Sequence, residues 1–212
     1  DCGWSSDVCS SDLYVPKKEA GIGRVIVDLL RGEVNGHLAQ LPVVYPRIDD
    51  LSKRLYPGCW FFETDFADHF YHFGVREEDR PYLGLQRPFG KGVCRYARLP
   101  MGGATSPHHC SRLTYAWQDE LRERPPFKGN YHLNLPGRPG YRPDRPFMQK
   151  LNDAGEPSAD DAIYVDDVIG LAPSYESGLA ALKELMLFAA DRGFVLKYKK
   201  IRSPAQYDRS FN

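Results

Sequence analysis

The sequence contains no long apolar run, no surplus of either charge and few cysteines. No stretch reaches the roughly 18 consecutive apolar residues of a membrane-spanning helix, which excludes a membrane-embedded protein and a membrane partner. The five cysteines are an odd number without CxxC spacing, so neither a disulfide framework nor a zinc site is indicated. We therefore expect an intracellular protein, cytoplasmic or nuclear, and not a secreted one.

The net charge of zero, from 28 basic and 28 acidic residues, argues against nucleic-acid binding through overall basicity. The charges are nevertheless segregated along the chain. Residues 80–112 carry six Lys or Arg and no acid, whereas residues 151–190 carry eight acids and one base. Each block alone is typical of a solvated surface. Their alternation also suits a site that holds metal ions beside a polyanion.

The first thirteen residues lack hydrophobic periodicity and the features of a targeting peptide. Within them, DVCSSDL (residues 7–13) resembles the translation of a sequencing-library adapter, and a disordered native terminus is the alternative. We set residues 1–13 aside as an adapter-derived, non-native segment. On that interpretation the chain is a fragment of a longer protein.

The remaining chain alternates strand and helix signals. Strands are predicted at residues 24–30, 59–66, 82–86, 93–99 and 194–198. A helix is predicted from Ser106 towards Arg124, followed by a Pro- and Gly-rich loop to residue 157 and a hairpin over residues 162–172. A second helix is predicted over residues 174–192, capped by Ser174 and ended by Gly193, with Leu179, Leu182, Met186 and Ala189 on its apolar face. This order indicates an α+β fold, an antiparallel sheet with helices packed on one face.

Three acidic residues stand out against this pattern. Asp166 and Asp167 form the tip of the predicted hairpin. Asp65 lies at the end of the aromatic strand predicted at residues 59–66. An Asp-Asp pair in a turn is more often solvated than catalytic. Adjacent carboxylates repel each other, however, and hard oxygen ligands suit Mg²⁺. Three carboxylates at neighbouring strand ends would meet the needs of a two-metal phosphoryl-transfer site.

Four motifs follow in order: FETDFADHFYHF, LPMGGATSP, YVDD and GFVLKYKK. Together they resemble the palm motifs of the reverse transcriptases of retroelements, especially long-terminal-repeat and related retrotransposons. The upstream strings YVPKKEAGIGRVIVDLL and YPRIDDL resemble the fingers strands of that family. The resemblance covers residues 14–117 and 161–206.

The resemblance implies a partial polymerase. Residues 14–58 correspond to part of the fingers, 59–117 to the first part of the palm and 161–200 to its second part. Residues 118–160 are an insertion or loop, and 201–212 a truncated approach to the primer grip. The thumb, and any ribonuclease H domain of the parent polyprotein, are missing from this chain.

The resemblance also implies roles for individual residues. Asp65, Asp166 and Asp167 would hold two Mg²⁺ ions, with Mn²⁺ as a substitute, and Lys200, or else Lys199, would protonate the pyrophosphate leaving group. The substrate-binding residues would be Lys17, Lys18, Arg24, Asp68, Phe70, Met101, Gly102 and Tyr164. Among these, Phe70 would exclude a 2′-hydroxyl, and Met101 and Gly102 would lie beneath the template base and the nucleotide.

The implied function is that of an RNA-directed DNA polymerase, a nucleotidyltransferase that adds a dNTP to a primer 3′-OH on an RNA or DNA template. Its partners would be the RNA template, the DNA primer, the RNA:DNA hybrid and dNTPs, with the basic residues 80–112 facing the phosphate backbones. The alternative is an inactive, decayed retroelement remnant that retains only nucleic-acid binding.

Overall fold

The computed structural model describes residues 11–16, 23–29, 34–47, 49, 52, 55, 57–86, 92–127 and 159–206. Its elements, in chain order, are β1 (Ser11–Pro16), β2 (Gly23–Asp28), α1 (Val34–His37), β3 (Trp60–Asp65), η1 (His69–His72), η2 (Glu77–Leu83), β4 (Gly84–Gln86), β5 (Val93–Arg95), α3 (Ser106–Leu121), β6 (Asp160–Tyr164), β7 (Asp167–Ala172), α4 (Tyr175–Asp191), η3 (Tyr198–Lys200) and β8 (Arg202–Gln206). They form two compact units. The first comprises Asp1–Val43 and Phe70–Cys110, and the second Val44–His69 and Ser111–Asn212.

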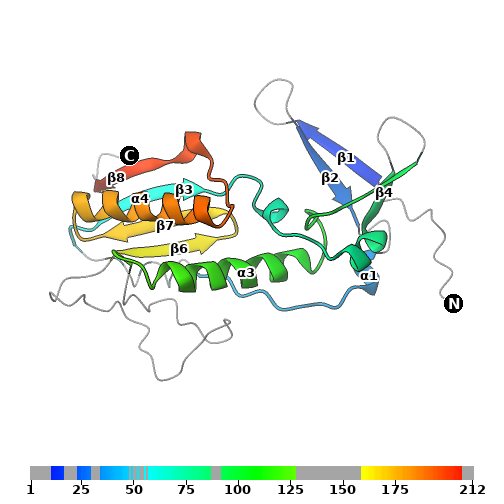
Figure 1. The fold of residues 1–212 in the computed structure, drawn as a ribbon, viewed down its shortest axis with the longest axis horizontal. Helices are drawn as coiled ribbons and strands as arrows, with labels where there is room; N and C mark the ends of the chain where they lie inside the picture. The colour runs from blue at the N-terminus through cyan, green and yellow to red at the C-terminus, as the bar shows by residue number, and fades with distance from the viewer. Residues whose placement is uncertain are drawn as a thin grey trace. The chain divides into compact units, whose positions relative to one another are not determined.

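The second unit contains a four-stranded sheet in the order β6-β7-β3-β8, with every neighbouring pair antiparallel (Figure 1). Because side chains alternate along a strand, Phe62, Thr64 and Phe66 project from one face of the sheet and Asp65 from the other. Two helical segments, α4 and the end of α3, pack on the face that carries Phe62. The predicted α+β arrangement, an antiparallel sheet with helices on one face, is confirmed.

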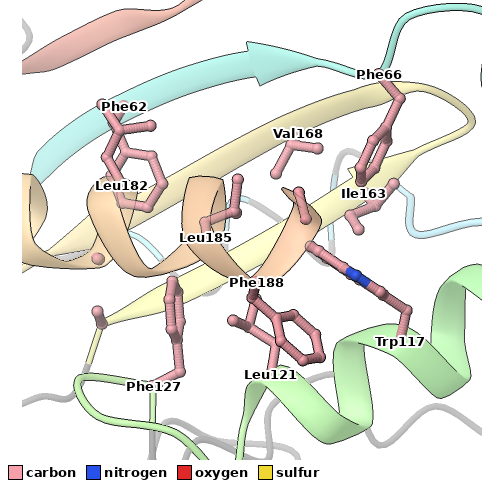
Figure 2. Packing of buried hydrophobic residues seen from close by; sticks show 13 residues of the cluster. Phe62, Phe66, Trp117, Leu121, Phe127, Ile163, Val168, Leu182, Leu185 and Phe188 are labelled. Carbon is pink, nitrogen blue, oxygen red and sulfur yellow. The ribbon is translucent and has the colours of Figure 1, made fainter. Parts of the chain in front are cut away.

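The core of this unit lies between the sheet and the helices, as Figure 2 shows. Its fully buried side chains include Phe62 of β3, Val168 of β7, and Leu185 and Phe188 of α4, with Leu121 reaching in from α3. Burying each such side chain contributes about 1.5–3 kcal/mol relative to leaving it exposed. Both helices pack on one face of the sheet, whereas Asp65 projects from the other face.

Gly170 of β7 allows the closest packing in this core. It pairs with Phe62 in the β3–β7 register, and the Phe62 ring lies directly over its Cα. A Cβ atom at this position would stand 1.9 Å from Cζ of Phe62, far inside van der Waals contact. A glycine within a strand often marks such a close approach. The Phe62–Gly170 pair therefore ties β3 to β7 in a single register.

The predicted boundaries of α4 are confirmed. The Ser174 side chain accepts a hydrogen bond from the Ser177 amide at 3.1 Å, and Gly193 ends the helix with a φ of 75°.

The predicted apolar face of α4 is partly wrong. Leu179 and Met186 are 47% and 39% exposed. The buried residues of the helix are Gly178, Ala181, Leu182, Leu185, Phe188 and Ala189. Apolar residues occupy much of the helix circumference, so their spacing alone does not select a face. The face that packs is the one on which small residues permit close approach. A Cβ on Gly178, for example, would lie 2.9 Å from Pro204 Cγ.

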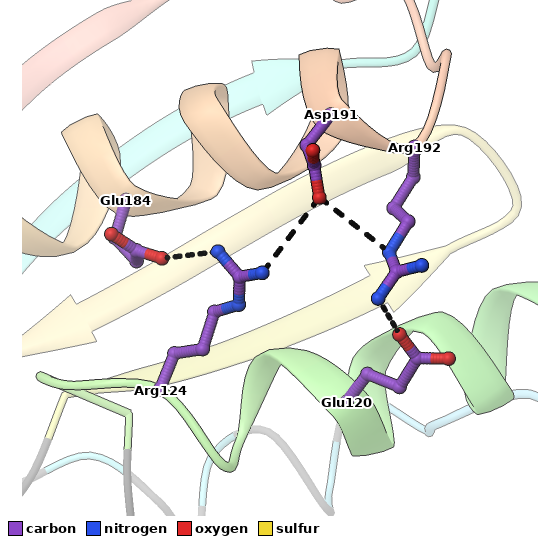
Figure 3. Close-up of polar contacts among 5 residues, drawn as sticks. All are labelled: Glu120, Arg124, Glu184, Asp191 and Arg192. Atoms are coloured by element: carbon purple, nitrogen blue, oxygen red, sulfur yellow. Dashed lines mark hydrogen bonds and ion pairs between the residues drawn. The ribbon is translucent and has the colours of Figure 1, made fainter.

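An ion-pair cluster joins the end of α3 to α4 (Figure 3). Arg124 lies 3.2 Å from Glu184 and 3.7 Å from Asp191, and Arg192 lies 2.6 Å from Glu120. The Arg124 guanidinium also stands 4.5 Å from the centre of the buried Phe188 ring. Partly exposed ion pairs contribute about 0–1 kcal/mol each, so this cluster orients the two helices more than it stabilises them.

The first unit contains two small antiparallel pairs, β1 with β2 and β4 with β5. The pairing of β4 with β5 confirms the predicted hairpin, although β5 ends at Arg95. Strand β1 begins at Ser11 and pairs residues 11–13 with residues 26–28, so three of the residues set aside as non-native belong to a strand. The adapter-derived, non-native origin of residues 1–13 stays a prediction.

The predicted strand at residues 194–198 is also corrected. Only Leu196 makes a bridge, to Phe66, and the chain then turns through η3 into β8. Pairing of this segment is limited because Lys197 leads at once into the 3-10 turn. Lys17, Lys18, residues 128–158 of the predicted loop and the tail after Gln206 lie outside the described residues.

Candidate active site

The strand register brings the three predicted carboxylates to one end of the sheet. Asp65, the last residue of β3, lies directly opposite Asp167, the first residue of β7. Asp166 lies in the turn between β6 and β7, and its carbonyl accepts a hydrogen bond from the Phe66 amide at 2.8 Å. Residues 101 positions apart in the sequence are thus juxtaposed through the backbone itself.

The turn that carries Asp166 contains an unusual backbone conformation. Val165 has a φ of 59°, in the left-handed region that β-branched residues rarely adopt. A positive φ at the first central residue alone is typical of the II′ turns that join hairpin strands. Residues held in such conformations cost about 1–3 kcal/mol and cluster at functional sites. The hairpin tip therefore carries strain next to the paired acids.

Two lysines neutralise these carboxylates. Lys197 and Lys200 each form an ion pair with Asp65, one to each carboxylate oxygen. Lys197 Nζ also lies 3.5 Å from Asp166 Oδ2, and Lys200 Nζ lies 3.5 Å from Asp167 Oδ1. The motif GFVLKYKK predicts Lys200 at the site but does not single out Lys197. The alternation of inward Phe194 and Leu196 with outward residues predicts that Lys197 faces away from the core, but it does not predict the pairing with Asp65.

The pKa directions follow from this arrangement. Burial acts to raise the pKa of Asp65, but hydrogen bonds from Lys197 and Lys200, together with Asp167, outweigh it and hold that pKa below its ordinary value. Burial, and then the hydrogen bond with Asp65, raise the pKa of Asp167. The same contact with Asp65 raises the pKa of Lys200. Asp65 is thus ionised, and the negative charges of Asp65 and Asp166 also act to raise the pKa of Asp167.

The donor set fits a hard divalent cation, because Asp65, Asp166 and Asp167 offer only carboxylate oxygens and two ammonium groups already stand among them as cations. Within the described part of the chain, no group of three or more His, Cys, Asp or Glu side chains converges closely enough to form a ready-made metal site. The carboxylates would have to turn towards an ion from their present lysine partners.

The remaining predicted site residues divide between the two units. Tyr164, opposite Asp167 on β6, is half-exposed, and its ring centre lies 5.2 Å from that of Tyr45. Asp68 is exposed in the turn after β3, with a φ of 49°. Four others belong to the first unit: Arg24 in β2, Phe70 in η1, and the adjacent pair Met101 and Gly102 in the turn before α3.

His69, next to Phe70, points into the core of the second unit. Its Nε2 lies 2.8 Å from Thr114 Oγ1, and its ring centre is 4.5 Å from that of Phe66. This buried side chain anchors the turn that leaves β3 immediately after Asp65.

Asn35 in the first unit is a residue that sequence analysis does not identify. Its side-chain amide donates to the Gly102 carbonyl at 3.0 Å, and its side-chain oxygen accepts from the Ala104 amide at 2.8 Å. The Asn35 backbone amide donates to Leu29 O at 3.0 Å. One side chain thus fixes the backbone of the turn that contains Met101 and Gly102. An isolated Asn carries no pattern that would have revealed this contact.

None of the helices in the described ranges is long and apolar enough to cross a membrane.

Comparisons with known proteins identify the fold of the chain. No protein-family model matches the chain, and no curated protein matches it. Among solved structures, it is similar to the foamy viral protease-reverse transcriptase in complex with dsDNA, with a TM-score of 0.65 and 16% identity over 96% of this chain and 34% of that one. It is also similar to the native protease-reverse transcriptase of prototype foamy virus, with a TM-score of 0.61 and 18% identity over 92% of this chain and 21% of that one. The chain therefore spans about a fifth to a third of the length of these proteins and has a reverse transcriptase-like fold.

Proposed function

We propose that this chain is the partial fingers and palm of a retroelement reverse transcriptase of the long-terminal-repeat or a related type. It would extend a primer 3′-OH with dNTPs on an RNA or DNA template. The observation that carries the proposal is the β3–β7 register, which sets Asp65 opposite Asp167 beside the turn containing Asp166. That constellation stands at one sheet end of a reverse transcriptase-like fold.

In this proposal Asp65, Asp166 and Asp167 hold two Mg²⁺ ions. The ions would act as Lewis acids that activate the attacking hydroxyl and stabilise the charge on the leaving pyrophosphate. Asp65 is suited to the central position, because it is buried and both of its oxygens already face cations. Lys200, kept protonated by its raised pKa, has a proton available for the leaving group.

Nucleic acid and nucleotide would be bound through the residues assigned by the resemblance. Phe70 would select deoxyribose by excluding a 2′-hydroxyl, and Met101 and Gly102 would support the template base. Arg24, with Lys17 or Lys18, would bind the triphosphate, for which guanidinium and ammonium groups are suited. The expected partners are the primer, the template, their hybrid and dNTPs.

A primer-extension assay on the longest natural protein that contains this chain tests the proposal, with RNA and DNA templates in Mg²⁺ and in Mn²⁺. We expect dNTP addition that EDTA abolishes and that Asp166→Asn lowers by at least about a hundredfold. Glu123→Gln, an exposed acid at the end of α3, is the matched control and should retain activity. Binding of template-primer without extension under any condition would instead support an inactive remnant.

A further inference from the structure

Lys197 occupies a position that nothing in the predicted reaction requires. Its ammonium is paired with Asp65 and lies 3.5 Å from Asp166, so it bridges the strand end and the hairpin tip. The side chain is 29% exposed, compared with 51% for Lys200. An ammonium that is largely enclosed between two carboxylates is part of the site and not a freely solvated surface charge.

The backbone fixes Lys197 at this place. Its amide donates to the Asp65 carbonyl at 2.7 Å, and the Ala67 amide donates to Val195 O at 2.7 Å. Leu196 between them bridges Phe66 and packs against the core cluster. Because alternate residues of an extended segment face opposite ways, the inward Leu196 obliges Lys197 to face the carboxylates.

We propose that Lys197 is an internal counter-ion that occupies the cation position between Asp65 and Asp166 in the metal-free protein and must withdraw before a divalent cation binds there. The inference rests on the proposed function, which supplies the expected Mg²⁺. Without a cation, the three carboxylates of the site would repel one another at close range. With Lys197 and Lys200 in place, the carboxylates remain assembled, and their present orientation towards lysine explains why they do not converge on a metal position.

The two cations therefore compete. A monovalent ammonium 3.5 Å from Asp166 must leave the space that Mg²⁺ would enter, so its presence weakens metal binding while it stabilises the metal-free fold. Removing the charge of Lys197 should have opposite effects on these two properties. A lysine with a purely structural role would lower stability equally with and without the metal.

The experiment compares this chain with its Lys197→Met variant, by thermal unfolding in EDTA and across a MgCl₂ titration at constant ionic strength. We expect Lys197→Met to unfold at a lower temperature than the wild type in EDTA. Its unfolding temperature should rise more when Mg²⁺ is added, and this rise should be half-complete at about tenfold lower Mg²⁺ concentration. Lys197→Arg, which keeps the charge, should retain the wild-type midpoint of the Mg²⁺ titration. Lys183→Met, an exposed lysine of α4, controls for loss of a surface charge and should change neither property.

The outcomes separate this inference from the proposed function. Equal Mg²⁺ midpoints for the wild type and Lys197→Met overturn the inference and leave the metal site intact. If neither protein gives a saturable response that Asp65→Asn abolishes, both the metal site and the inference fail. Should Lys197→Met be unfolded in EDTA, Mg²⁺ must restore its folding, and failure to do so overturns the inference.

Discussion

Substituting Gly170 by Ala tests the packing that fixes the β3–β7 register, and with it the position of Asp65 opposite Asp167. The new methyl group would meet the Phe62 ring at 1.9 Å, so the ring must retreat by about 1.5 Å to reach an ordinary contact of 3.4 Å. Phe62 is 1% exposed and is packed within the core cluster, where side chains are close-packed. The substitution should therefore overpack the core.

The magnitude follows from two opposing effects. Overpacking of a filled core costs about 1–3 kcal/mol, and the tight contact at Gly170 places this case in the upper half of that range. Alanine also restricts the backbone of the unfolded chain more than glycine does, which raises the free energy of unfolding by about 0.4–1 kcal/mol. We expect Gly170→Ala to lower the free energy of unfolding by about 2 kcal/mol.

Urea denaturation of the chain measures this change. Gly36→Ala is the control, because a Cβ there meets nothing within 4 Å, and it should raise the free energy of unfolding by about 0.4–1 kcal/mol through the unfolded chain alone. Combining Gly170→Ala with Phe62→Leu should cost less than the sum of the single variants by about 1 kcal/mol or more, since the smaller side chain makes room. A Gly170→Ala protein as stable as the wild type, or strict additivity in the double variant, would refute the reasoning.

Three further predictions concern the site. Val165→Gly should raise the free energy of unfolding by about 1 kcal/mol, because glycine relieves the positive φ at some entropic cost; urea denaturation that shows destabilisation would contradict the inferred strain. In the metal-free protein the raised pKa of Asp167 means that its neutral form favours folding, fully below the unfolded pKa of about 3.9 and progressively less as pH rises through the folded value. Asp167→Asn should therefore raise the unfolding temperature at pH 7 and lose this advantage near pH 3, whereas an advantage that is the same at both pH values would count against a raised pKa of Asp167. Phe70→Ala should admit ribonucleotides in primer extension, and unchanged sugar selectivity would remove Phe70 from the proposed gate.

Local signals in the sequence predict much of the fold. The aromatic strand β3, the hairpin of β6 and β7, and the capped helix α4 each carry a pattern that is complete within a short stretch of chain. The buried face of α4 was not predictable in this way, because Leu179 and Met186 are as apolar as the residues that pack. Only the small residues that meet β8 and the sheet decide it, and those contacts are formed by distant segments.

In the candidate site, too, some residues are predicted by local sequence patterns and others only by contacts between distant segments. Residue type and position in the sequence were enough to select Asp65, Asp166 and Asp167 as candidate metal ligands. Lys197 could not be distinguished from Lys199 and Lys200 in one lysine-rich run, because its pairing depends on hydrogen bonds to a strand about 130 residues upstream. Contacts between distant segments, and not the residue types, single it out.

The most direct test of the central claim is the rate of single-nucleotide incorporation at saturating Mg²⁺ by the natural protein that contains this chain, compared with its Asp65→Asn variant. Among the carboxylates of the described residues, Asp65 is the one paired with both lysines, so it should be indispensable to a metal-dependent polymerase site. We expect robust incorporation by the wild type and by Glu123→Gln, and a loss of at least about a hundredfold for Asp65→Asn with template-primer binding retained. Incorporation by Asp65→Asn at the wild-type rate would contradict this expectation.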